Sequence, residues 1–362
     1  MAYNEKYGDL ARQKDYARRQ HIMRMKMKRK RQIFIRKCFL AAAMFAAVAG
    51  FVNLGIAGKE QTDKASELVE TETIAVAADN DVTQNKVNEV KAPLVPYAQK
   101  NENYQEVMDE AVFSPYIAVI EVESGKLIAG RNSDSIIYPA SMTKVMTLLV
   151  AVENIDDFSK TYTFGTELLN SLYIEEATVA GFSEGETVGV DDLLYGLILP
   201  SGADSAVAVA TIAAGSEEDF VSLMNGKAKE MGLKNTHFAN PTGLHSEEQY
   251  TTPAEMAMIM EVAMSNPTCA KYLSTYQHTT SATAQHPEGI LLTSTMFSRM
   301  YGDEVEGVLI TAGKTGFTNE ALHCLVNFAQ KNGKHYVTVE AGAQDKWHTI
   351  FDSFALFRDY AI

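Results

Sequence analysis

The stretch Ile117-Ala118-Val119-Ile120-Glu121-Val122 is separated by Ser124-Gly125 from a second apolar run, Lys126-Leu127-Ile128-Ala129. Both runs contain residues that favour strands, and Ser-Gly favours a turn, so the segment predicts two antiparallel strands joined by a tight connection. A helix is expected after Pro139, because apolar residues recur there at helical spacing. These residues are Val145, Leu148, Leu149 and Val152.

The C-terminal part of the chain predicts a second hairpin and a closing helix. Asn332-Gly333 lies between the apolar runs 322–329 and 335–341, and this dipeptide favours a hairpin turn. In 347–362 aromatic residues recur at helical spacing; we expect this helix to pack on a sheet, and a membrane-surface helix is the alternative. Together these elements predict an α+β fold, in which helices flank one antiparallel sheet and a mainly helical lobe is inserted. The site is expected in the cleft between sheet and lobe.

Composition limits the possible classes of protein. Apolar residues make up 46% of the 362 residues, which is enough for a large core. A net charge of −14 argues against nucleic-acid binding. The three cysteines have no metal-binding spacing, so we expect no metal site. Cys269 and Cys324 are expected to be free thiols, with a disulfide between them as the alternative.

Positive charge is concentrated at the N-terminus, where residues 1–37 contain 13 Lys and Arg against 3 Asp and Glu. The twenty residues 38–57 carry no charge, and as a helix they would reach about 30 Å, the thickness of a bilayer core. We therefore expect a basic cytoplasmic segment at 1–37 and a single membrane anchor at 38–57, with the rest of the chain on the extracytoplasmic face. Ala47-Val48-Ala49 keeps a cleaved signal peptide, and hence a secreted protein, as the alternative.

Residues 58–105 are polar and have few aromatic side chains and no sustained apolar period. This composition predicts a flexible linker that gives the following domain reach. The globular pattern begins at about residue 106, so we expect one domain at 106–362.

Ser141-Met142-Thr143-Lys144 opens the helix expected after Pro139. Residues three apart share a helix face, so the Ser141 hydroxyl and the Lys144 amine can meet. A serine becomes an effective nucleophile when a neighbouring base takes its proton, and lysine can act as that base only when it is neutral. The ordinary pKa of lysine is about 10.4, so burial, a helix N-terminus or a second cation must lower the pKa of Lys144.

Two further motifs follow along the chain. Ser201-Gly202-Ala203 comes after the apolar run 193–199, and Lys314-Thr315-Gly316 comes after a strand expected at 307–311. Gly316 would let the strand approach a ligand closely, and Lys314 with Thr315 could hold an anion. Taken alone, Ser201-Gly202-Ala203 is also typical of a helix start, and Lys314-Thr315-Gly316 is also typical of an ordinary strand end.

Together, and in this order, the three motifs resemble S-x-x-K, S-D-N and K-T-G, the signature of penicillin-binding proteins and class A β-lactamases. The gaps between them are about 60 and 110 residues, and Asn240-Pro241-Thr242-Gly243-Leu244-His245 adds to the similarity. Over roughly residues 110–361 the chain resembles the D-alanyl-D-alanine carboxypeptidases of serine peptidase family S11, the low-molecular-mass penicillin-binding proteins. The resemblance implies a β-lactamase/transpeptidase-like fold, a place at the bacterial cell membrane, and an enzyme without a cofactor.

The resemblance implies catalytic roles for three side chains. Ser141 would be the nucleophile, and Lys144 would be its general base. Ser201 would pass protons between that hydroxyl and the leaving amine. The reaction would release the terminal D-alanine of peptidoglycan stem peptides through an acyl-enzyme, and β-lactams would be covalent inhibitors.

Substrate-binding roles are implied for the residues of the third motif. Lys314 would support the proton network, Thr315 would bind the terminal carboxylate, and Gly316 would allow close approach. The backbone N–H groups of Ser141 and Phe317 would form the oxyanion hole. The implied partners are stem peptides ending in D-Ala-D-Ala and, through residues 38–57, the membrane.

One position departs from the family pattern, because Ala203 stands where the middle motif has asparagine. Loss of one hydrogen bond costs roughly 0.5–3 kcal/mol, so we expect a slower but working enzyme. Ala203 leaves open a penicillin-binding sensor without efficient turnover. A β-lactamase is a further alternative, although the chain has no E-x-x-L-N motif to support deacylation.

Four other polar residues are expected to be structural. His245 follows an expected turn, and Glu255 is expected to complete the N-terminal capping of a helix that starts at Thr252-Pro253. No catalytic role is expected for Asp204 or His323.

Overall fold

The computed structural model describes residues 96–300 and 305–362. The basic segment expected at 1–37, the anchor at 38–57 and most of the linker at 58–105 lie outside these residues. Within the two described ranges, no helix has the length and apolar character needed to cross a membrane. The expected domain boundary at residue 106 is wrong, because the end of the expected linker, Gln99–Glu106, forms a strand of the main sheet.

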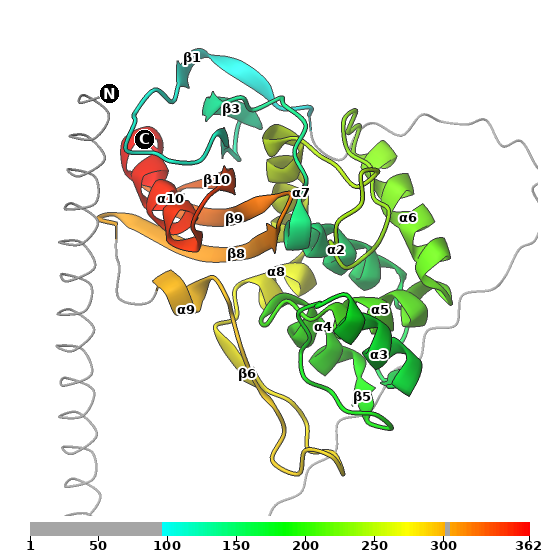
Figure 1. Ribbon diagram of the computed structural model, residues 1–362. Helices are drawn as coiled ribbons and strands as arrows, with labels where there is room; N and C mark the ends of the chain where they lie inside the picture. The colour runs from blue at the N-terminus through cyan, green and yellow to red at the C-terminus, as the bar shows by residue number, and fades with distance from the viewer. Residues whose placement is uncertain (1–95, 301–304) are drawn as a thin grey trace, which may run out of the picture. The chain divides into compact units, whose positions relative to one another are not determined.

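The first and last strands of the domain join in one six-stranded sheet, as the sequence predicts (Figure 1). Its order is β1 (Gln99–Glu106), β3 (Lys126–Arg131), β2 (Tyr116–Glu121), β10 (Lys334–Ala343), β9 (Leu322–Lys331) and β8 (Val308–Thr318). The expectation of a wholly antiparallel sheet is wrong at one edge, where β1 pairs with β3 in parallel. Strand β1 lies at the edge of the sheet with β3 as its one neighbour, and parallel neighbours cannot be joined by a tight hairpin.

The hairpin expected at Asn332-Gly333 is confirmed. Lys331 pairs with Lys334 across the turn, so β9 and β10 are joined by two residues. Both residues have positive φ, 53° at Asn332 and 79° at Gly333, which is the conformation of a type I′ turn.

Alternate residues of β10 face opposite sides of the sheet. Val337 and Val339 belong to the large core that also contains Met258 of helix α7 (Pro253–Ser265). Tyr336 packs instead with Phe357 of helix α10 (Lys346–Tyr360). The C-terminal helix therefore packs on the sheet as expected, and α7 and α10 cover opposite faces (Figure 1).

Between β3 and β8 the chain forms the expected mainly helical lobe. Its helices are η1 (Ala140–Thr143), α2 (Lys144–Asn154), α3 (Thr166–Ile174), α4 (Val190–Ile198), α5 (Ala203–Ala214), α6 (Glu217–Glu230), α7, α8 (Pro267–Leu273) and α9 (Phe297–Met300). Two short antiparallel pairs accompany them, β4 (Thr161–Thr163) with β5 (Thr187–Gly189) and β6 (Gln277–Thr279) with β7 (Leu291–Thr293). The family fold expected from the sequence is thus assembled from a sheet and an inserted lobe.

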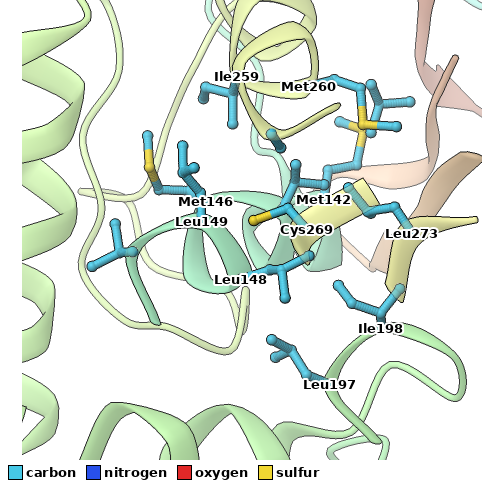
Figure 2. Packing of buried hydrophobic residues seen from close by; sticks show 14 of the residues in the cluster. Met142, Met146, Leu148, Leu149, Leu197, Ile198, Ile259, Met260, Cys269 and Leu273 are labelled. Carbon is cyan, nitrogen blue, oxygen red and sulfur yellow. The ribbon is translucent and has the colours of Figure 1, made fainter. Parts of the chain in front are cut away.

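Helix α2 lies at the centre of the lobe's core. Met146, Leu148 and Leu149 of α2 are fully buried, and they pack with side chains of α4, α7 and α8 (Figure 2). Because this packing holds α2 from several sides, the residues at its first turn have a fixed position.

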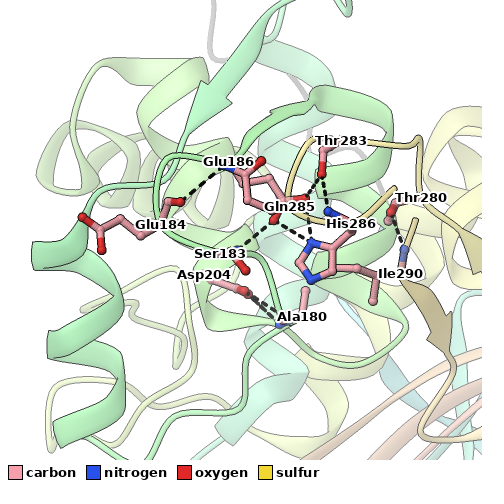
Figure 3. Close-up of polar contacts among 11 residues, drawn as sticks. Ala180, Ser183, Glu184, Glu186, Asp204, Thr280, Thr283, Gln285, His286 and Ile290 are labelled. Carbon is pink, nitrogen blue, oxygen red and sulfur yellow. Dashed lines mark hydrogen bonds and ion pairs between the residues drawn. The ribbon is translucent and has the colours of Figure 1, made fainter. Parts of the chain in front are cut away.

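The β6–β7 hairpin extends away from the sheet (Figure 1). Its connecting loop is held to the lobe by the buried carboxylate of Glu186, which accepts a hydrogen bond from Thr283 at 2.7 Å and pairs with His286 at 2.9 Å (Figure 3). His278 forms a second link of this kind, at 2.7 Å from Asp192. These contacts tie the hairpin and its loop to the lobe.

Candidate active site

The first motif lies where the 3-10 helix η1 continues into α2. Lys144 is the first residue of α2, and its Nζ lies 3.2 Å from Ser141 Oγ. The same amine also donates to the backbone carbonyl of Thr242. Lys144 is fully buried, whereas Ser141 is partly exposed. The helical spacing therefore brings the hydroxyl and the amine together as the sequence predicts.

Burial lowers the pKa of Lys144 to about 7, while the negative charge of Asp204 acts in the opposite direction. An ammonium group loses its hydration in such a site, which favours the neutral amine. At neutral pH a large share of the molecules therefore carries Lys144 in the form that can accept a proton.

The second motif brings Ser201 to the same place from the end of α4. Ser201 has a φ of 73°, and Ala140, next to Ser141, has a φ of 46°. Side chains other than glycine reach this left-handed region at a cost of roughly 1–2 kcal/mol. The surrounding structure thus holds both serine-bearing turns in unfavourable backbone conformations, as is common at functional sites.

Lys314 joins the second and third motifs. Its buried Nζ donates to Ser201 Oγ at 2.8 Å and to the backbone carbonyl of Thr315 at 2.9 Å. Burial lowers the pKa of Lys314 well below its usual range, and the charges of Lys144 and Arg299 lower it further. Of the causes expected from the sequence, which are burial, a helix N-terminus and a second cation, burial is the main one that lowers the pKa of both amines in the structure.

The third motif lies inside strand β8, and the expected strand end at residue 311 is wrong. The strand runs to Thr318 and forms the edge of the sheet. A carbon added at Gly316 would lie 2.9 Å from the carbonyl oxygen of Pro139 and 3.2 Å from the nitrogen of Ser141. Glycine is therefore required here for close packing between β8 and η1.

The expected oxyanion donors belong to these two packed segments. Ser141 is in η1, and Phe317 follows Gly316 directly in β8. The side chain of Phe317 is 51% exposed and stacks on His323 with ring centroids 4.4 Å apart. All seven residues named from the sequence thus lie in η1, at the start of α2, in the turn between α4 and α5 or in β8.

A loop at residues 240–245 completes the surroundings of Lys144 and contains the turn expected before His245. Asn240 Oδ1 accepts hydrogen bonds from the backbone nitrogens of Thr242 at 3.2 Å and Gly243 at 2.8 Å. Gly243 has a φ of 79°, and an added carbon would lie 2.2 Å from the carbonyl oxygen of Ala140. The Asn-Pro-x-Gly sequence is a turn signal and agrees with the turn expected here. A cavity of about 450 Å³ opens beside it, between α3, α5 and α6.

Ala203 begins α5 and is almost fully buried. Its backbone nitrogen donates to the carbonyl of Thr178 at 2.7 Å. The next residue, Asp204, accepts from the backbone nitrogens of Ala180 at 2.8 Å and Gly181 at 3.3 Å (Figure 3). Asp204 thus holds the chain segment beside the second motif.

The residues expected to be structural include the cap of α7, Glu255 and His245. Thr252 caps α7, with its hydroxyl accepting from the nitrogen of Glu255 at 3.1 Å. The role expected for Glu255 is wrong, because its buried carboxylate does not close the cap but accepts from Tyr97 Oη at 2.9 Å and from the nitrogen of Asn235 at 3.0 Å. Residues 97 and 255 are distant in sequence, so local capping patterns could not reveal this pair. His245 packs edge-on against a tyrosine ring, with centroids 4.7 Å apart.

The two cysteines of the described domain are free and buried, as expected. Burial raises the pKa of the Cys269 thiol and of the Cys324 thiol to about 12. Neither thiol is therefore ionised at neutral pH, and thiolates are the reactive form of cysteine.

Comparison with known proteins agrees with this arrangement. The family model described as D-alanyl-D-alanine carboxypeptidase matches residues 103–345. The chain belongs to this family. The match covers every element from β2 to β10 and therefore includes all three motifs.

Individual relatives support the same family. The chain is 35% identical over 230 residues to D-alanyl-D-alanine carboxypeptidase DacF of Bacillus subtilis, covering 62% of this chain and 56% of the relative. It is 36% identical over 147 residues to D-alanyl-D-alanine carboxypeptidase DacC of Escherichia coli, covering 39% and 37%. The chain thus spans about half or less of the length of these relatives.

Solved structures confirm the fold. The crystal structure of the Streptomyces K15 DD-transpeptidase superposes with a TM-score of 0.63 at 25% identity, covering 71% of this chain and all of that one. The D-alanyl-D-alanine carboxypeptidase from Mycobacterium tuberculosis superposes with a TM-score of 0.57 at 27% identity, covering 67% and 92%. The transpeptidase-like fold expected from the sequence is therefore confirmed.

Proposed function

We propose that this chain is a serine-type D-alanyl-D-alanine carboxypeptidase that removes the terminal D-alanine of peptidoglycan stem peptides through an acyl-enzyme on Ser141. One observation carries the proposal: Ser141 Oγ lies 3.2 Å from the amine of Lys144, a fully buried lysine whose pKa is lowered to about 7. A hydroxyl beside a neutral buried amine is the arrangement that nucleophilic catalysis requires.

In the acylation step, neutral Lys144 takes the proton of Ser141 as Oγ attacks the carbonyl carbon of the penultimate D-alanine. The new C–O bond places negative charge on the carbonyl oxygen, for which the N–H groups of Ser141 and Phe317 are the proposed donors. When the peptide bond breaks, Ser201 gives its proton to the leaving amine and receives in turn the proton held by Lys144, so Lys144 is neutral again. The hydrogen bond from Lys314 to Ser201 supports this transfer.

In the deacylation step, a water molecule attacks the ester carbonyl and gives its proton to the base. The C–O bond to Ser141 breaks, and Oγ regains a proton. Both steps need a base that is neutral before the attack and charged after it, so one lysine with a pKa near neutrality can serve twice.

Before acylation the substrate must be bound by its free end. Thr315 of β8 is the proposed donor to the substrate's terminal carboxylate.

Ala203 favours a second candidate, a penicillin-binding sensor that is acylated but releases little D-alanine. The amide expected at this position would help to orient the substrate, and alanine has no polar group to replace it. Acylation would still be possible, because Ala203 takes no part in the contact between Ser141 and Lys144.

We also propose that residues 38–57 remain as an uncleaved anchor that places the domain on the extracytoplasmic face of the bacterial membrane. The uncharged run and the basic segment before it support this proposal. The intact mass of the protein extracted from membranes is the test. A mass that lacks residues 1–49 would instead support cleavage after Ala49.

The decisive experiment measures D-alanine release from diacetyl-Lys-D-Ala-D-Ala by the full chain, by Ser141→Ala and by Ser159→Ala, which alters an exposed serine of the same lobe. We expect release by the wild type and by Ser159→Ala, and none by Ser141→Ala. A stable penicillin adduct on wild-type protein without D-alanine release would favour the sensor. Rapid penicillin hydrolysis would favour a β-lactamase.

A further inference from the structure

Thr295 lies in the segment that leads from the helical lobe to the sheet, between β7 and α9. Its backbone nitrogen donates to the carbonyl of Leu199 at 3.0 Å, two residues before Ser201. Its hydroxyl oxygen lies 2.7 Å from the hydroxyl oxygen of Thr315. Thr295 therefore contacts both the turn of the second motif and the side chain of the third.

The neighbours of Thr295 hold it in place. The nitrogen of Ser294 donates to the carbonyl of Tyr276 at 2.8 Å, and Met296 is buried. A carbon added at Gly313 would lie 2.3 Å from the sulfur of Met296, so Met296 packs directly on β8. With both flanking residues fixed, the hydroxyl of Thr295 is held beside Thr315 before any substrate arrives.

The chemistry of the expected ligand decides the direction of the hydrogen bond between the two hydroxyls. A carboxylate only accepts hydrogen bonds, so Thr315 must give it the single proton of its hydroxyl. The oxygen of Thr315 then has lone pairs left and accepts from Thr295. Among the described contacts, Thr295 is the only side chain bonded to this hydroxyl, because Lys314 bonds the backbone carbonyl of Thr315.

We propose that Thr295 is a positioning residue for recognition of the substrate's free C-terminal carboxylate, acting by donating a hydrogen bond to Thr315. The inference rests on the proposed function and adds a residue outside the three motifs. The hydrogen bond from Thr295 orients the hydroxyl of Thr315 and strengthens the hydrogen bond that Thr315 donates to the carboxylate. Bonds to a charged acceptor are also stronger than neutral ones. The contribution of Thr295 should therefore be larger for a carboxylate than for a neutral end group.

The test compares diacetyl-Lys-D-Ala-D-Ala with the same peptide ending in a carboxamide, using the full chain. Thr295→Val keeps the side-chain shape and removes the hydroxyl. For the carboxylate substrate we expect KM to rise about 2- to 10-fold with kcat nearly unchanged, the range for one lost hydrogen bond. For the carboxamide we expect a smaller loss. Thr295→Ser should restore the wild-type KM.

The matched control is Thr293→Val, two residues earlier, whose hydroxyl bonds Gln277 at 3.0 Å and not Thr315. We expect it to behave as wild type on both substrates. In the double variant Thr295→Val/Thr315→Val, the loss should not exceed that of Thr315→Val alone, because Thr295 acts through Thr315.

Each result has a defined meaning. Equal losses on both substrates, a fall in kcat alone, or additive effects in the double variant would overturn the role of Thr295 while leaving the proposed function intact. If the wild type released no D-alanine, the proposed function itself would fail. In that case the rate of acylation by penicillin, which also carries a carboxylate, still tests Thr295, and a rate unchanged in Thr295→Val would overturn the inference.

Discussion

The amine of Lys314 donates a hydrogen bond to Ser201 at 2.8 Å across 113 positions of sequence. Ser201 belongs to the helical lobe, and Lys314 belongs to the edge strand of the sheet. The proposed proton path therefore exists only when lobe and sheet are correctly packed together. Stability of the lobe and activity at the site are coupled for this reason.

The pKa of Lys144 predicts how activity depends on pH. A protonated lysine cannot accept the proton of Ser141, so kcat/KM should rise with pH as Lys144 loses its proton. Because the pKa is lowered to about 7, we expect the midpoint of this acid limb near pH 7. A pH–rate profile between pH 5 and 11 provides the measurement. A midpoint near pH 10, the ordinary pKa of lysine, would contradict the lowered pKa of Lys144.

Asp204→Asn should move that midpoint to lower pH. The negative charge of Asp204 raises the pKa of Lys144, and asparagine removes this charge. The carboxylate also accepts from the nitrogen of Ala180, so some loss of stability is expected. A thermal melt separates the two effects, because unfolding lowers the amplitude of the profile and does not displace its midpoint.

Ala203→Asn should increase the rate of D-alanine release. The new amide could hydrogen-bond the substrate, and a single hydrogen bond is worth about 1 kcal/mol, or roughly fivefold in kcat/KM. Ala203→Leu is the control of similar volume without a polar group. A large fall in turnover with Asn, but not with Leu, would indicate that another polar group already performs this role.

Gly243→Ala should impair both stability and acylation. An added carbon would lie 2.2 Å from the carbonyl oxygen of Ala140 and 2.9 Å from the Cα of Ser141, so the segment that carries the nucleophile must shift. Gly333→Ala is a matched control, because Gly333 has the same φ of 79° and open space around it. Both variants share the cost of a left-handed alanine, roughly 1–2 kcal/mol. Only Gly243→Ala should also slow acylation by penicillin, and equal rates in both variants would contradict the proposed clash.

Tyr97→Phe should destabilise the domain although it precedes the expected boundary at residue 106. The Tyr97 hydroxyl donates to the buried carboxylate of Glu255 at 2.9 Å. Hydrogen bonds to charged groups contribute about 1.5–3 kcal/mol. Chemical denaturation measures this loss, with Tyr173→Phe, at an 84% exposed position, as the control. An unchanged free energy of unfolding would mean that the domain does not depend on residues before β1.

Features that depend on local chemistry were predictable from the sequence. Asn332-Gly333 determines its turn without help from the rest of the chain, and helical spacing alone brings Ser141 to Lys144. The resemblance of three motifs in order supplied the remaining site residues, because their meeting depends on pairing of strands and helices distant in sequence.

Features that depend on backbone pairing or distant partners were not predictable. Strand β1 reads QKNENYQE and has no buried residue, so it shows no apolar alternation and joins the sheet through its backbone. The strand expected to end at residue 311 continues to Thr318 because its backbone pairs with β9, where Gly316 lies opposite Cys324. Thr295 has no motif around it, and its partner lies on another element of the fold.

The order of the strands also determines where a mechanical load would act on the domain. The described chain enters the sheet at β1, and Lys314 lies on β8 at the opposite edge. Five spacings of about 4.8 Å separate these strands, which is roughly 24 Å. A pull applied through the preceding chain would therefore load the contact of Tyr97 with Glu255 and the β1–β3 pairing before it reached the strand beside the nucleophile.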